Sequence, residues 1–179
     1  LKFPLLNSER LIKKLNSNQS LKRSEEYQKD SYFVPAHRDF LKQEPVLEWL
    51  RIRQTNNGSS MNYKRWPSDN ESWCDEFETG IESFKTLEKI LKSLDFRKIA
   101  VVEKTRYTWF YGNAKVSIDN VRELGYFIEI EAEKNFKSVD EAKTYLHSVL
   151  KELNADVGPQ SFKGYPYLVL EKKRLVSKK

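Results

Sequence analysis

Positively charged side chains recur at every second residue in several short stretches of this sequence. Alternate residues of an extended strand point to the same side, so two such cations share one face of the strand. Arginine and lysine grouped in this way can bind a polyphosphate, because a guanidinium group donates two parallel hydrogen bonds to phosphate oxygens. The cations in stretches of this kind are Arg51, Arg53, Lys64, Lys104, Arg106 and Lys115.

Carboxylates follow the same alternation, and they are oxygen ligands suited to Mg²⁺ or Mn²⁺. A turn near residue 124 would pair the strand that holds Asp119 with the strand that holds Glu129 and Glu131, so these three are candidate metal ligands. Cations for phosphate and carboxylates for metal are the parts needed for metal-assisted phosphoryl chemistry. The alternating carboxylates are Glu76, Glu78, Asp119, Glu129 and Glu131.

The stretches that hold these residues alternate between apolar and polar side chains, which predicts β-strands. Most connections between them are short, which favours antiparallel pairing, and Gly112-Asn113 predicts a hairpin turn. We expect strands at residues 1–5, 27–34, 49–54, 62–66, 73–79, 97–111, 115–119 and 126–133, with a further strand at 167–170.

Three segments have the periodicity of amphipathic helices. We expect Ser8, Ser83 and Ser138 to cap them, and Glu141 completes a capping box with the third. The second and third helices each follow a strand that contains a Glu-x-Glu pair. Because the first helix also follows a strand, the same pattern predicts a Glu-x-Glu pair immediately before Leu1.

Two arrangements fit these strands and helices. In the first, the charged faces point to water and the apolar faces form the core of a sandwich. In the second, a closed eight-stranded antiparallel barrel of the α+β class holds the charged faces inside a tunnel, and the helices cover its outer apolar surface. Alternation alone fits both arrangements.

Composition limits the class of protein. The chain has 179 residues, 13% of them aromatic, which excludes a disordered body, and no apolar run approaches the length of a membrane helix. The formal net charge is +6, but residues 171–179 carry five basic residues and one glutamate. We therefore predict a domain over residues 1–170 and a basic tail over 171–179.

Cys74 is the single cysteine, which favours a reducing compartment, so we expect a cytoplasmic protein. The sequence begins with Leu1, and we expect it to start inside a longer reading frame. We expect His147, on the third helix, to be a surface or partly packed residue. We expect the four tryptophans to be packing residues, although one of them could line a nucleobase pocket.

The charged motifs in their order along the chain resemble the CYTH family, also called the triphosphate tunnel metalloenzymes. The resemblance spans roughly residues 1–170. Its motifs are Leu50-Arg51-Ile52-Arg53, Tyr63-Lys64, Glu76-Phe77-Glu78, Glu103-Lys104-Thr105-Arg106, Ile118-Asp119, Leu124-Gly125-Tyr126-Phe127 and Ile128-Glu129-Ile130-Glu131.

The resemblance implies an eight-stranded tunnel, a triphosphate substrate and Mg²⁺ or Mn²⁺ as cofactor. It places Asp119, Glu129 and Glu131 on the metal side, with Glu76 and Glu78 as further carboxylates of the tunnel. Lys2 matches the last residue of the family's amino-terminal Glu-x-Glu-x-Lys signature, whose glutamates would precede Leu1. The implied phosphate-binding residues are Lys2, Arg51, Arg53, Lys64, Lys104 and Arg106.

Within the family, the sequences of the motifs and the segment His37-Arg38-Asp39-Phe40 most resemble class IV adenylyl cyclases. These enzymes convert ATP to cyclic AMP and pyrophosphate. A loop held by its own hydrogen bonds would explain this segment equally well. The alternatives are a triphosphatase acting on tripolyphosphate or thiamine triphosphate, and a tunnel that binds polyphosphate or nucleotide without turnover.

Nucleic acid is not expected as a partner, because the body outside the tail is almost balanced in charge and the glutamate pairs would repel a phosphate backbone. We expect no membrane partner. A homodimer is left open.

Overall fold

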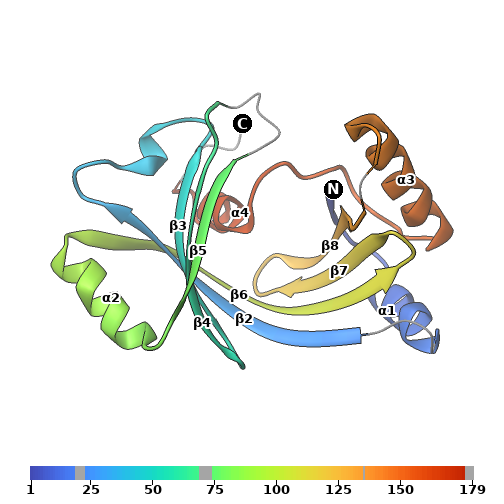
Figure 1. Cartoon of the computed structure of the whole chain (residues 1–179), viewed down its shortest axis with the longest axis horizontal. Coiled ribbons are helices and arrows are strands. Elements are labelled where there is room, and N and C mark those ends of the chain that lie inside the picture. The colour runs from blue at the N-terminus through green and yellow to red at the C-terminus, as the bar shows by residue number, and fades with distance from the viewer. Residues whose placement is uncertain (19–22, 69–73, 135, 176–179) are drawn as a thin grey trace. The chain divides into compact units, whose positions relative to one another are not determined.

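The computed structural model describes residues 1–18, 23–68, 74–134 and 136–175. In this part of the chain, eight strands form one antiparallel sheet (Figure 1), as the alternation predicts. Their order across the sheet is β1 (Lys2–Pro4), β8 (Gly125–Ala132), β7 (Ala114–Val121), β6 (Phe96–Tyr111), β2 (Arg23–Pro35), β3 (Glu48–Thr55), β4 (Gly58–Arg65) and β5 (Asp75–Ile81).

Four α-helices and one short 3₁₀ helix accompany the strands in the described residues. No helix among these residues is long and apolar enough to cross a membrane. The helices are α1 (Ser8–Ser17), α2 (Phe84–Ser93), α3 (Val139–Glu152) and α4 (Tyr165–Lys172), and the 3₁₀ helix is η1 (Phe40–Lys42).

The chain divides into two compact units. The first unit contains Leu1–Tyr27 and Lys104–Gly164, and the second contains Gln28–Glu103 and Tyr165–Lys179. The long strands β2 and β6 run through both units. The tail predicted from residue 171 begins inside the last turn of α4, and residues 176–179 lie outside the described part.

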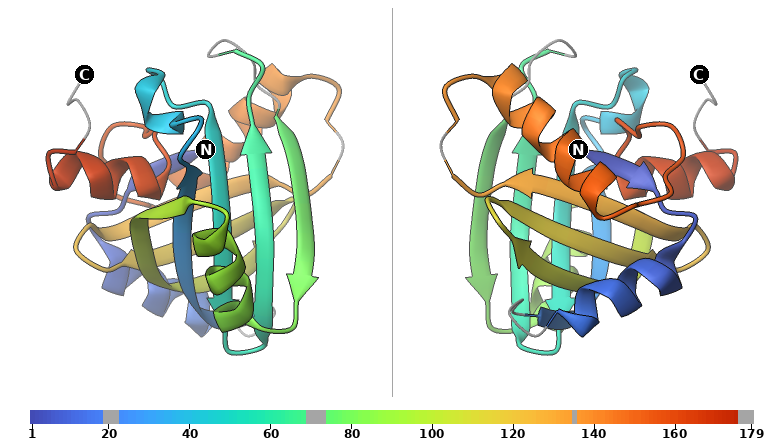
Figure 2. Two further views of the ribbon diagram at one scale, coloured as in Figure 1. Left: turned by 90° about the vertical axis from the view of Figure 1, so that its left-hand side faces the viewer. Right: turned by 90° about the vertical axis from the view of Figure 1, so that its right-hand side faces the viewer.

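In the first unit, α1 and α3 cover the apolar side of β7 and β8 (Figure 2, right). Every second residue of each strand faces these helices, as the period of a strand requires. This core contains Leu11 and Leu15 from α1, Leu146, Val149 and Leu150 from α3, Val116 and Ile118 from β7, and Ile128 and Ile130 from β8.

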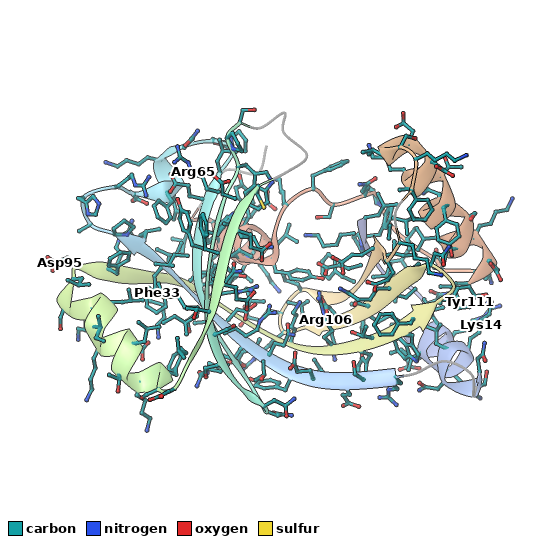
Figure 3. The ribbon with its side chains drawn as sticks, viewed as in Figure 1. Lys14, Phe33, Arg65, Asp95, Arg106 and Tyr111 are labelled. Carbon is teal, nitrogen blue, oxygen red and sulfur yellow. The ribbon has the colours of Figure 1, made fainter. Side chains whose placement is uncertain are left out.

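In the second unit, α2 covers the apolar side of β2 and β3. Leu91 of α2 packs in one cluster with Phe33, which points toward the helix (Figure 3), and with Leu50 and Ile52 of β3. The charged Arg51 and Arg53 alternate with these two core residues and therefore face the other way.

In the described residues, helices and not a second sheet cover the apolar faces of the two units, as the barrel arrangement predicts and the sandwich does not. The α+β class is confirmed. The closure of the barrel is not shown, because the described strands have an open order with β1 and β5 at its ends. β1 has three residues, and Pro4 at its end has no N–H to donate to a further strand.

Two local expectations are corrected. Asn7 and not Ser8 is the N-cap of α1, so the helix begins at Ser8, one residue earlier than predicted. Residues 167–170 form part of α4 and not a strand, because a short run of apolar residues fits either element and Pro166 favours the first turn of a helix. The caps at Ser83 and Ser138 are confirmed, and each side chain accepts a backbone hydrogen bond.

Candidate functional site

The first charged face lies on the first unit, opposite the side that α1 and α3 cover. The register places Arg106 of β6 opposite Asp119 of β7, so both share this face. The pairing of β7 with β8 and of β8 with β1 extends this charged face onto β8 and β1. The face consists of Lys2, Lys104, Arg106, Lys115, Asp119, Glu129 and Glu131.

Asp119 is the centre of this face, and its side chain is 0% exposed. Arg106, labelled in Figure 3, donates from Nε to Oδ1 at 2.7 Å and from Nη2 to Oδ2 at 2.6 Å. Lys104 donates to Oδ2 at 2.8 Å. Both oxygens of the carboxylate therefore accept from a cation, and the two cations are held in place by it.

These contacts decide the charge of Asp119. Burial on its own would raise the pKa of the Asp119 carboxyl, but the Arg106 hydrogen bonds and the charges of Lys104 and Arg106 outweigh it and lower the pKa to about 2. Burial also lowers the pKa of the Lys104 ammonium, against the attraction of Asp119.

The two glutamates of β8 also pair with cations. Glu129 forms an ion pair with Arg106, and Glu131 forms one with Lys115 at 2.7 Å. Lys2 lies opposite Glu129 in the pairing of β1 and β8. Burial lowers the pKa of the Lys2 ammonium, while Glu129 and Asp119 act in the opposite direction.

The second charged face lies on the second unit, opposite the side that α2 covers. Sequence reasoning missed its central residue, Asp30 of β2, whose side chain is 3% exposed. Arg53 donates to both Asp30 oxygens, from Nε and from Nη2, at 2.7 Å each. The face consists of Asp30, Arg51, Arg53, Asn62, Lys64, Glu76 and Glu78.

Arg51 is less completely bonded than Arg53. Its Nη1 lies 3.7 Å from an Asp30 oxygen, which is an ion pair beyond ordinary hydrogen-bond length. Its Nε is buried and has no hydrogen-bond partner among the described residues. Arg51 therefore keeps an unsatisfied donor on a face that the sequence predicts to bind phosphate.

The glutamates of β5 are fixed by neighbours on β4. Lys64 pairs with Glu76 at 3.0 Å, and the buried Asn62 donates to Glu76 at 2.8 Å. Burial acts to raise the pKa of the Glu76 carboxyl, but these partners outweigh it and the pKa is lowered. Glu78 accepts from Ser60 at 2.7 Å. Asn62 and Ser60 were not predicted, because neutral residues carry no charge signal.

The predicted metal ligands do not form a ready group. No set of three or more His, Cys, Asp or Glu side chains in the described part of the chain has an arrangement that could hold a metal ion. Asp119 is enclosed by cations, whereas Glu129 and Glu131 lie two residues apart on one face and are 24% and 52% exposed. Their oxygens fit Mg²⁺ or Mn²⁺, and the metal site stays a prediction.

The segment around His37 is held by its own contacts. Asp39 accepts from the Leu41 backbone N–H at 3.0 Å, caps η1 and pairs with Arg97. Arg38 pairs with Glu48 at 3.1 Å. These bonds support the loop interpretation of the segment.

The strand predicted over residues 73–79 is β5, which begins at Asp75 and contains Glu76 and Glu78. Trp73 of the predicted strand lies outside the described residues.

The low pKa of Asp119 predicts an acid-sensitive fold. The charged carboxylate stabilises the native state above pH 4, and this contribution of about 2 kcal/mol is lost as the pH falls from about 4 to about 2. In Asp119→Asn, the free energy of unfolding should be lower at pH 7 and should change less across that window. Urea denaturation at several pH values measures both effects.

The matched control is Asp75→Asn, an exposed aspartate at the start of β5, which should retain the wild-type pH profile. Equal pH profiles for wild type and Asp119→Asn would contradict the role of this carboxylate.

Comparison with known proteins identifies a family that matches this chain. The family model of the CYTH domain matches residues 1–162. A protein of Methanocaldococcus jannaschii named "Putative adenylate cyclase MJ0240" is 31% identical over 130 residues, which are 72% of this chain and 71% of that protein.

Solved structures share the fold. The Pyrococcus horikoshii protein PH1819 is 26% identical with a TM-score of 0.68, over 97% of this chain and 99% of that one. The Hippeastrum protein HpAC1, for which a dominant triphosphatase activity is described, is 15% identical with a TM-score of 0.65, over 99% of this chain and 96% of that one. The family match extends over most of the sequence and confirms the resemblance of the motifs, so the chain belongs to the CYTH domain family.

Proposed function

We propose that this chain is a metal-dependent enzyme that acts on a triphosphate, and that it converts ATP to cyclic AMP and pyrophosphate. The observation that carries the proposal is the incomplete bonding of Arg51. A buried guanidinium nitrogen without a partner costs free energy, which an anionic ligand would recover by accepting its hydrogen bond. The neighbouring Arg53 and Lys64 would extend the same phosphate contact along the second charged face.

The balance of charge supports the need for a metal. The first charged face has four cations against three carboxylates, and the second has three against three. This small excess cannot neutralise a triphosphate, so a divalent cation must accompany it. Glu129 and Glu131 would hold Mg²⁺ or Mn²⁺, which when bound would offset the charge of the phosphates and of the leaving group.

The chain's own residues would orient the substrate. Cyclisation requires the ribose 3′ oxygen to attack the α-phosphorus in line with departing pyrophosphate, while arginine and lysine stabilise the charge on the phosphate oxygens. Arg106 and Lys104 are held by Asp119, and Arg53 is held by Asp30, so their positions are set before the substrate binds. Such preorganisation lowers the cost of reorganising charges during the reaction.

A triphosphatase is the alternative, in which water attacks the terminal phosphorus. The Hippeastrum protein of this fold is described with that activity. The cyclase is preferred because the M. jannaschii relative, which shares more sequence identity, carries the cyclase name. The closed tunnel implied by the resemblance stays a prediction, and a crystal structure with tripolyphosphate and Mn²⁺ would test it.

Product analysis tests the proposal directly. The full-length protein should convert ATP to cyclic AMP and pyrophosphate when Mg²⁺ or Mn²⁺ is present and should be inactive in EDTA. Glu131→Gln should lose turnover while it still binds tripolyphosphate without metal, because the cations are unchanged. Chromatography of the products and calorimetry with Mn²⁺ measure these effects.

Release of terminal phosphate from ATP, tripolyphosphate or thiamine triphosphate would favour the triphosphatase. Binding without any product would favour the non-catalytic tunnel. Unchanged Mn²⁺ affinity in Glu131→Gln would remove this carboxylate from the metal site.

Lys64 allows a test of phosphate binding that spares the fold. Arg53 and Lys104 pair with buried aspartates, so removing either would leave a buried carboxylate short of a partner and would destabilise the protein. Lys64 pairs with Glu76, and the two side chains are 33% and 42% exposed. We expect Lys64→Met to weaken binding of tripolyphosphate by about 1.5 to 3 kcal/mol with little change in melting temperature.

The matched control is Lys98→Met, which removes a lysine from another exposed ion pair of the second unit, with Glu88 of α2. It should leave the affinity for tripolyphosphate unchanged. Equal losses of affinity in the two variants would show that only the net charge matters.

A further inference from the structure

An aromatic pair lies at one end of the second charged face. Trp49, Arg51 and Arg53 are alternate residues of β3 and share a side of the strand. Tyr32 of β2 lies opposite Arg51, and its ring meets the Trp49 ring edge to face, with centroids 5.7 Å apart and planes at 83°. The row of phosphate-binding candidates on β3 therefore ends in an indole.

Trp49 does not belong to the described cluster that packs against α2. The core packs against α2 from the other side of β3, through Leu50 and Ile52. Tyr32 is buried, whereas Trp49 is only half-buried, so part of this residue is accessible to a ligand. The buried Tyr32 ring packs against the Trp49 ring and restricts its orientation.

The spacing along β3 matches a ligand with an aromatic group at one end and phosphates at the other. Side chains two residues apart on a strand are about 6.6 Å apart, so Arg51 and Arg53 lie one and two such steps from Trp49. Lys64 lies directly opposite Trp49 in the pairing of β3 and β4. A nucleoside triphosphate with its base on Trp49 would extend its ribose and phosphates toward the two arginines.

We propose that Trp49 is a stacking platform for the base of a nucleoside triphosphate and makes the site prefer nucleotides over tripolyphosphate. The inference rests on the proposed function, since it assumes that Arg51 and Arg53 bind phosphate. Tripolyphosphate has no aromatic group and gains nothing from the indole. Stacking is tolerant of base identity, because every base presents an aromatic face, so Trp49 would favour nucleotides in general.

Calorimetry on three variants tests the platform, with a nonhydrolysable ATP analogue and a nonhydrolysable tripolyphosphate analogue as ligands. Trp49→Leu should weaken the ATP analogue about tenfold and change the tripolyphosphate analogue less than about twofold. Trp49→Phe keeps an aromatic face and should retain most of the affinity. Phe77→Leu is the control, because it removes a 66% exposed ring between Glu76 and Glu78, on the other face of β5.

The outcomes separate this inference from the proposed function. Equal loss for both ligands, or no loss for either in Trp49→Leu, overturns the platform while triphosphate binding stands. If wild type binds neither ligand, both proposals fail.

Wild-type protein provides a measurement that does not depend on how the variants fold. Ribose 5-triphosphate lacks the base, so it should bind about tenfold more weakly than ATP, and ATP alone should quench the tryptophan fluorescence. Equal affinities for the two compounds would overturn the platform.

Discussion

Each charged face depends on one buried carboxylate that pairs with two cations. Asp119 and Asp30 are almost fully enclosed, and an unpaired charge in such a place would cost several kcal/mol. Each therefore requires the arginine that grips it with two hydrogen bonds, and each fixes that arginine in return. The cations that the sequence marks for phosphate are in this way held by the fold before any ligand arrives.

The two faces repeat one design that the sequence pattern only partly revealed. Arg53 faces Asp30 and Arg106 faces Asp119 across neighbouring strands, and a second cation precedes each arginine by two residues. The same strands carry the apolar residues that the helices cover, on alternate positions. A register slip of one residue would move these aspartates to the apolar side, so charge and hydrophobic burial specify the same pairing.

Alternation was enough to predict what lies on each face of a strand, because the side-chain period is a local property. It placed Arg51, Arg53 and Glu131 correctly on charged faces, and the helical stripes correctly predicted which side the helices cover. It could not predict the partners. Asp30 pairs with a residue 23 positions away, and a lone aspartate in a strand gives no sign of a cation that only the register brings near.

The arginines of the two faces differ in how many of their hydrogen bonds are made within the protein, and this difference indicates where a ligand would bind. Arg53 and Arg106 each donate two hydrogen bonds to a buried aspartate. Arg51 lies beyond hydrogen-bond length of Asp30, and its buried Nε has no partner among the described residues. That shortfall lowers the stability of the protein alone by about 1 to 3 kcal/mol. An anion at Arg51 would supply the missing acceptor. The ligand would then bind where the protein alone lacks a hydrogen bond, next to Arg53, whose position Asp30 already fixes.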